Sequence, residues 1–191
     1  MNLNKKTIIT INGKPGSGKS SAAKGSAEAL GFQRFSSGDF MRRMAIKRGV
    51  SITELNILAE KDKQIDFDID EEVRKTGELE NLVIDSRMAF HWIPNSFKVY
   101  LDLPPEIAKA RIMESLKSDK LRQASEQETD EETVYEKIIA RLNSENKRYM
   151  DLYGVDNSDP AMYDLVIDTN KSNLEEVVSE IVTKYKEWIN S

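Results

Sequence analysis

The chain has 191 residues, a length that suits one domain with a sizeable hydrophobic core. Its formal net charge of −5 argues against general nucleic-acid binding, which favours a basic surface. Cysteine is absent, which excludes disulfides and thiolate metal sites, and the single histidine, His91, excludes zinc sites built on paired histidines. No apolar run approaches the roughly 20 residues that span a bilayer, and residues 1–6 are polar, so we expect a cytoplasmic protein.

Short β-branched or apolar runs alternate along the chain with longer amphipathic stretches. The short runs predict strands at residues 7–11, 32–36, 82–84, 97–103 and 165–167. The longer stretches predict helices at residues 20–30, 39–48, 104–116, 129–153 and 174–189. Capping boxes, Ser51 with Glu54 and Thr129 with Glu132, mark two helix starts. The dense charge of residues 61–80 indicates a solvated helical face.

This alternation predicts an α/β fold in layers, with a mainly parallel sheet of about five strands. Ligands of such sheets bind at the carboxyl ends of the strands. Polar clusters follow four of the predicted strands, at residues 12–13, 36–39, 85–87 and 168–170. We therefore expect these clusters to converge on one edge of the sheet.

The spacing Gly-x-x-x-x-Gly-Lys-Ser, that of a phosphate-binding P-loop, is matched directly after the first predicted strand. Its glycines let the backbone curl around a phosphate, and the following helix adds the partial positive charge of its N-terminus. Lys19 is expected to reach the β- and γ-phosphates of ATP, and the Ser20 hydroxyl to bind Mg²⁺. A plain glycine-rich turn with a solvated lysine is the alternative, and the position between a strand and a helix disfavours it. The predicted ATP-binding residues are Gly13, Lys14, Pro15, Gly16, Ser17, Gly18, Lys19, Ser20 and Ser21.

Two other nucleotide-binding classes find no support in the chain. A dinucleotide-binding loop needs Gly-x-Gly-x-x-Gly, which Gly13, Gly16 and Gly18 do not supply. Guanine recognition of the GTPase kind needs Asn-Lys-x-Asp, which the sequence lacks.

Beyond the loop, the sequence resembles nucleoside monophosphate kinases. Ser37-Gly38-Asp39-Phe40-Met41-Arg42 resembles the segment that opens the monophosphate-binding part in that family, and Asp85-Ser86-Arg87 resembles its acidic-x-Arg segment after the third strand. Residues 141–154 and 163–167 are similar to late segments of archaeal-type cytidylate kinases, so the resemblance spans nearly the whole chain. It implies a three-layer P-loop NTPase fold in a single domain, residues 1–191, with a helical monophosphate-binding part at 37–80 and a lid-like loop at 117–130.

A nucleoside monophosphate is a dianion, and the planar guanidinium group of arginine binds such a group through paired hydrogen bonds. Arg42 and Arg87 each lie just beyond a predicted strand end, so we expect them to clamp the acceptor's phosphate. The resemblance adds Ser37 and Asp39 to the acceptor site. Asp85 is expected to hold Mg²⁺ through a bound water, or else to pair with a neighbouring arginine.

Arg141 and Arg148 lie seven residues apart, two helical turns, and so share a helix face. With a closing loop, these arginines and Lys19 are expected to act in catalysis by neutralising charge on the transferred phosphoryl group. The alternative is that both arginines are ordinary surface charges.

These features predict phosphoryl transfer from ATP, with Mg²⁺ as cofactor, to a nucleoside monophosphate, and the resemblance implies CMP or dCMP. The alternatives are another small-molecule kinase, of adenylate or dephospho-coenzyme-A type, and a non-catalytic ATP-binding module with a regulatory or RNA-associated role. We expect ATP and a nucleoside monophosphate as partners, no membrane or stable nucleic-acid partner, and a monomer or weak dimer.

Overall fold

A five-stranded, all-parallel sheet forms the centre of the computed structural model, which describes residues 5–118 and 131–191. The strand order is β2-β3-β1-β4-β5. Each of the five predicted strands is present within two residues of its expected bounds, so the predicted α/β class is confirmed. The strands are β1 (Ile8–Gly13), β2 (Gln33–Ser36), β3 (Leu82–Asp85), β4 (Phe97–Asp102) and β5 (Leu165–Asp168).

The first strand lies in the middle of the sheet because its sequence suits burial on both faces. All six residues of β1 are buried, and most are β-branched, as is typical of a central parallel strand. It pairs with β3 on one side and with β4 on the other, in a register that sets Ile11 beside both Asp85 and Val99. The carboxyl ends of β1 and β3 therefore lie next to each other.

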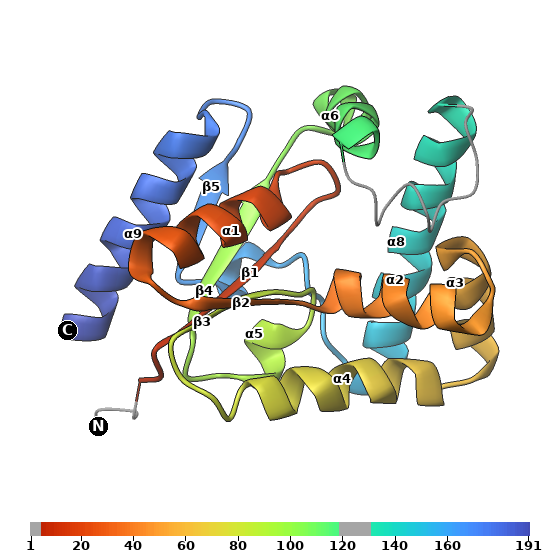
Figure 1. The fold of residues 1–191 in the computed structure, drawn as a ribbon, viewed down its shortest axis with the longest axis horizontal. Coiled ribbons are helices and arrows are strands. Elements are labelled where there is room, and N and C mark those ends of the chain that lie inside the picture. Colours follow the sequence, from red (N-terminus) through yellow and green to blue (C-terminus); the bar gives the residue numbers. More distant parts are fainter. Residues whose placement is uncertain (1–4, 119–130) are drawn as a thin grey trace.

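Helices cover both faces of the sheet, which gives three layers (Figure 1). On one face α1 (Lys19–Leu30) and α9 (Leu174–Asn190) pack their apolar sides against Ile9, Val83 and Leu101. On the other face α4 (Gln64–Thr76) and α5 (Ala89–Trp92) enclose Ile8, Leu82 and Ile84. The remaining helices are α2 (Ser37–Arg48), α3 (Ile52–Lys61), α6 (Pro105–Ser118) and α8 (Glu131–Tyr153), with a 3₁₀ turn, η1 (Pro160–Met162).

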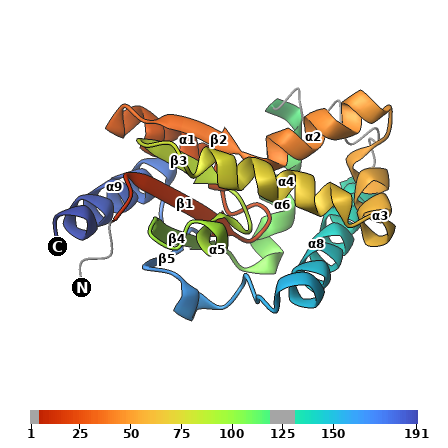
Figure 2. The same ribbon diagram turned by 90° about the horizontal axis from the view of Figure 1, so that it is seen from below.

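A second helical layer stands beside one end of the sheet, where α2, α3, α4 and α8 gather (Figures 1 and 2). It has its own apolar core, which includes Met41, Ile52, Leu55 and Ile65. The predicted capping box at the start of α3 is present, with Ser51 and Glu54 exchanging both hydrogen bonds. Most of the predicted lid and the start of the Thr129–Glu132 capping box lie outside the described residues.

One expectation about this layer is confirmed only in part. Most charged residues of 61–80, among them Lys63 and Lys75, are exposed and form the expected solvated face, but Asp66 and Asp70 of α4 are 3% and 4% exposed. Both side chains point at α8, where Asp66 pairs with Arg148 and Asp70 accepts a hydrogen bond from Tyr153. Charge density along a helix does not distinguish carboxylates in water from carboxylates paired against another helix, because the partner is distant in the sequence.

Candidate active site

The phosphate loop joins β1 to α1 and has the backbone that its glycines permit. Gly16 and Gly18 lie in the left-handed region, with φ of +75° and +83°. A Cβ atom on Gly13, whose φ is +152°, would lie 2.2 Å from the carbonyl oxygen of Leu101. Because Gly18 is the N-cap of α1 and has no side chain, the first N–H groups of that helix are left for a ligand. The loop is therefore built to hold an anion.

Lys19 lies across this loop. Its Nζ donates hydrogen bonds to the carbonyl oxygens of Gly13 (2.8 Å) and Lys14 (2.9 Å). Pro15, Gly16, Lys19 and Ser20 all line the adjacent cleft. The ammonium group of Lys19 is thus fixed beside the space that the phosphates of a nucleotide would occupy.

Three other predicted loop residues do not line that cleft. Lys14 forms an ion pair with Asp102 at 2.6 Å, and both side chains are more than two-fifths exposed. Ser17 is buried, and Ser21 is exposed on α1. The structure thus separates the residues of the predicted ATP site into a group that lines the cleft and a group that supports the loop.

The two predicted metal ligands lie in contact. Ser20 donates a hydrogen bond from Oγ to Oδ2 of Asp85 at 2.7 Å, and Asp85 is 6% exposed at the end of β3. A hydroxyl and a carboxylate are oxygen ligands of the kind that Mg²⁺ prefers. Within residues 5–118 and 131–191, no cluster of three or more acidic or histidine side chains could hold a metal ion by itself. The pair therefore fits a magnesium ion whose other ligands are waters and phosphate oxygens.

Arg34, which the sequence analysis did not single out, lies beside this pair. Its Nη2 is 3.5 Å from Oδ2 of Asp85 and 3.3 Å from Oδ2 of Asp39. The other oxygen of Asp39 is 3.2 Å from Nη1 of Arg42. Asp39 thus holds two arginines and is absent from the lining of the cleft, so among the predicted acceptor residues it acts on Arg42 rather than facing the cleft.

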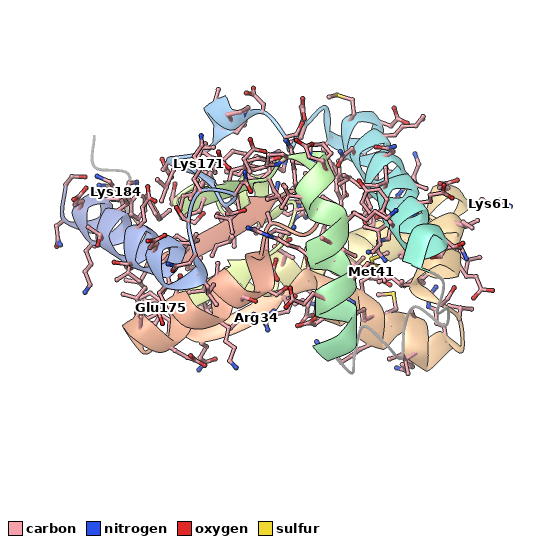
Figure 3. The ribbon with its side chains drawn as sticks, turned by 90° about the horizontal axis from the view of Figure 1, so that it is seen from above. Arg34, Met41, Lys61, Lys171, Glu175 and Lys184 are labelled. Carbon is pink, nitrogen blue, oxygen red and sulfur yellow. The ribbon has the colours of Figure 1, made fainter. Side chains whose placement is uncertain are left out.

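The cleft itself has a volume of about 120 Å³ and lies between the phosphate loop and the helical layer. Figure 3 looks down on this end of the molecule, where α6 crosses with Arg34 and Met41 on opposite sides of it in the view. The predicted residues that line the cleft, besides those of the loop, are Ser37, Arg42, Asp85, Arg87 and Arg141. Side chains from the ends of β1, β2 and β3 therefore meet there, as the parallel sheet requires.

The fourth polar cluster lies at the same edge but not in the cleft. Thr169, after β5, accepts a hydrogen bond at its backbone oxygen from Nη2 of Arg111 on α6 (2.9 Å). Asp168 pairs with Lys171. Since β5 is the edge strand, separated from β3 by β1 and β4, its loop is too far along the sheet to join the other three clusters.

Arg87 and Arg141 share a carboxylate that the sequence analysis missed. Glu145 of α8 is 5% exposed and forms an ion pair through Oε2 with Nε of Arg87. Its Oε1 is 3.9 Å from Nε of Arg141. Burial raises the pKa of Glu145, but Arg87, Arg141 and Arg148 outweigh that effect and hold the pKa below its ordinary value. In the sequence, Glu145 looks like one half of an ordinary i, i+4 surface pair with Arg141.

Arg148 does not line the cleft, contrary to the role predicted for it. Its Nε and Nη2 donate to the two carboxylate oxygens of Asp66 at 2.7 and 3.3 Å. Nη2 also reaches Oδ1 of Asn56, and Nη1 reaches Ser144. Arg141 and Arg148 do share a face, but two turns of helix separate them by about 10 Å, so they meet different neighbours.

No helix among the described residues is long and apolar enough to cross a membrane. Residues 8–171 match the model of the cytidylate kinase-like family. A cytidylate kinase from Halobacterium salinarum is 37% identical over 166 residues, which cover 85% of this chain and 80% of that protein. An S-adenosylmethionine-dependent nucleotide dehydratase from Lacinutrix mariniflava is 36% identical over 184 residues, 95% of this chain but 36% of the longer relative. A shikimate kinase from Bacteroides thetaiotaomicron, 14% identical, superposes with a TM-score of 0.60 over 97% of this chain and 99% of that one, which shows the P-loop kinase fold.

Proposed function

Because the chain belongs to the cytidylate kinase-like family, we propose that it transfers the γ-phosphoryl group of ATP to a nucleoside monophosphate, preferentially CMP or dCMP. One observation carries the proposal. The phosphate loop, with Lys19 and the Ser20–Asp85 pair, faces a cleft lined by Arg42, Arg87 and Arg141. A site for a polyphosphate donor and a site for a second phosphate thus share one edge of the sheet.

On the donor side, the loop N–H groups and the N-terminus of α1 bind the phosphates of ATP. Lys19 exchanges its hydrogen bonds to the loop carbonyls for phosphate oxygens. Ser20 and Asp85 hold Mg²⁺, which supplies positive charge to the phosphate oxygens of ATP when bound. Asp85 is already fixed by Ser20 and Arg34, so its carboxylate needs little reorganisation to accept a cation.

On the acceptor side, Arg42 and Arg87 bind the dianionic phosphate through their guanidinium groups. Ser37, the first residue of α2, adds the N-terminus of that helix to the same cleft. Arg141 supports the negative charge on the group in transfer. No protein nucleophile is needed, because positioning and charge stabilisation account for most phosphoryl transfer.

The choice of CMP or dCMP rests on the family and on relatives named cytidylate kinase. The test is a panel of CMP, dCMP, UMP, AMP, GMP and dephospho-coenzyme A with Mg-ATP, with the diphosphate product measured directly by chromatography. We expect the highest kcat/KM with CMP or dCMP. Equal rates for CMP, UMP and AMP would refute the base preference. A preference for AMP or dephospho-coenzyme A would favour one of the other kinase classes. If no acceptor gave a product, the protein would instead be a non-catalytic ATP-binding module.

A further inference from the structure

Glu145 is a buried carboxylate that belongs to neither the donor nor the acceptor machinery described above. It lies on α8, 5% exposed, and it connects two arginines that line the cleft. Arg87 comes from the loop after β3, and Arg141 lies one turn before Glu145 on α8. One carboxylate on α8 therefore lies between an arginine from the end of the sheet and an arginine of α8 itself.

The contacts of Glu145 explain how it acts. It meets both arginines at Nε, by an ion pair with Arg87 and at 3.9 Å from Arg141. An arginine that is held through Nε keeps its two terminal amino groups for a second anion. The carboxylate thus fixes Arg87 without occupying the end that binds phosphate, whereas Arg141, at 3.9 Å, is only within range of its charge.

Charge gives Glu145 a second effect. Arg87 and Arg141 would repel each other and would attract any small anion if the carboxylate were absent. Two cations against one carboxylate leave the trio with a single net positive charge. The cleft thereby stays attractive to a phosphate, and Arg87 stays oriented.

Tyr149 completes the surroundings. It lies one turn after Glu145 and lines the same cleft. Burial, followed by the charge of Glu145, raises the pKa of Tyr149 well above its ordinary value, so it remains a neutral hydroxyl. Tyr149 therefore adds no negative charge beside Arg87 and Arg141, whereas Glu145 does.

We propose that Glu145 is the positioning residue of the acceptor-phosphate site, holding Arg87 oriented and moderating the charge of Arg87 and Arg141. This inference rests on the proposed function for its kinetic part. Glu145 does not contact the acceptor's phosphate itself, since two anions would repel. It acts through the two arginines.

The test uses Glu145→Gln, which keeps the size of the side chain and removes its charge. We expect kcat with the preferred acceptor to fall about tenfold or more, because Arg87 loses its orientation, while the KM for ATP is unchanged. Inorganic phosphate, measured by calorimetry and as an inhibitor, is expected to bind about threefold or more tightly, because the cleft gains one positive charge. A merely structural residue would not shift these two quantities in opposite directions.

The matched control is Asp151→Asn, which neutralises an exposed carboxylate paired with Lys147 on the same helix and is expected to alter neither quantity. Thermal unfolding of each variant identifies the folded proteins, and Glu145→Asp replaces Glu145→Gln if the latter does not fold. The shorter carboxylate keeps the charge but withdraws the contact, so kcat falls while phosphate affinity stays near that of the parent.

Two results would overturn the proposal. One is a folded Glu145→Gln with parental kcat and parental phosphate affinity. The other is a parallel loss of phosphate binding and transfer, which means that Glu145 only supports the local fold. If the parent protein phosphorylates no acceptor, the proposed function fails, but the calorimetric measurement of phosphate binding still tests the role of Glu145.

Discussion

Replacing Arg148 by methionine separates a structural arginine from a catalytic one. In the parent, Arg148 donates two hydrogen bonds to Asp66 and further ones to Asn56 and Ser144. Methionine fills much of the same volume but leaves Asp66, 3% exposed, without its cation. We expect the protein to lose stability while its chemistry at low temperature is retained.

The magnitude follows from the burial of the pair. Removing one partner of a buried ion pair costs about 3–5 kcal/mol, a large part of the roughly 5–15 kcal/mol that holds a domain together. At about 2–4 °C per kcal/mol for a chain of this size, the melting temperature should fall by about 6–20 °C. The double variant Asp66→Asn/Arg148→Met should recover part of the loss, with a coupling energy of about 0.5–3 kcal/mol.

The loss of stability in Arg148→Met depends on pH, and the sign of that dependence follows from the pKa of Asp66. Burial raises the pKa of Asp66, and Arg148 opposes that rise. Without Arg148 the pKa of the folded state rises further above that of the unfolded state. A carboxyl group with a raised folded pKa stabilises the fold when protonated and loses that contribution as pH rises through the folded pKa. The deficit of Arg148→Met should therefore shrink as the pH is lowered from 7 toward the raised pKa.

The assay is thermal unfolding by circular dichroism over that pH range, with kcat measured well below the melting temperature of the variant. Lys147→Met is the control, because it breaks an exposed pair on the same helix and should leave the melting temperature unchanged within error. We expect kcat of Arg148→Met within about threefold of the parent. An unchanged melting temperature together with a large loss of kcat would refute this reasoning and indicate that Arg148 acts in catalysis.

Three further predictions concern the loop and the clamp. Lys19→Ala should lower kcat by about 10²–10³-fold for every acceptor, because it removes a fixed charge beside the phosphates, while the circular dichroism spectrum stays that of the parent. Initial rates within tenfold of the parent would contradict this prediction. Arg87→Ala should raise the KM of the acceptor and leave that of ATP unchanged, so an identical acceptor saturation curve would remove Arg87 from the clamp. Gly13→Ala should abolish ATP binding in a fluorescent-nucleotide titration, since the Cβ of the new alanine would overlap the backbone of Leu101. The control is Gly49→Ala, whose Cβ would meet no atom within 4 Å. It should cost about 1–2 kcal/mol of backbone strain at the helix end and leave ATP binding intact.

Features that depend on neighbours in the chain were predictable. The β-branched run that became β1 is fit for burial on both faces wherever it lies, and the loop after it curls because its own glycines permit positive φ. The parallel order of the strands brings their polar ends to one edge, so the sequence alone predicts that Ser20, Asp85 and Arg87 lie near one another. The family was likewise recognisable from segments of sequence, and the match over residues 8–171 confirms it.

Oligomeric state and location in the cell stay predictions. For the lid, the described residues cover only the end of α6, at Ser118, and the start of α8, at Glu131. The roles of the individual site residues are likewise proposals, which the variants above test.

The sequence by itself determined the layered fold, the phosphate loop and the presence of arginines after two strands, because these follow from local pattern and from the geometry of parallel sheets. Only the tertiary structure decided which charges pair. Arg148 binds Asp66, 82 residues away, while Arg141, two turns earlier on the same helix, lies beside Glu145 in the cleft. The reason is that burial and charge pairing depend on which surfaces α3, α4 and α8 present to one another. The helical period of a sequence shows which side chains share a face of the helix, but it does not show which other helix or strand packs against that face.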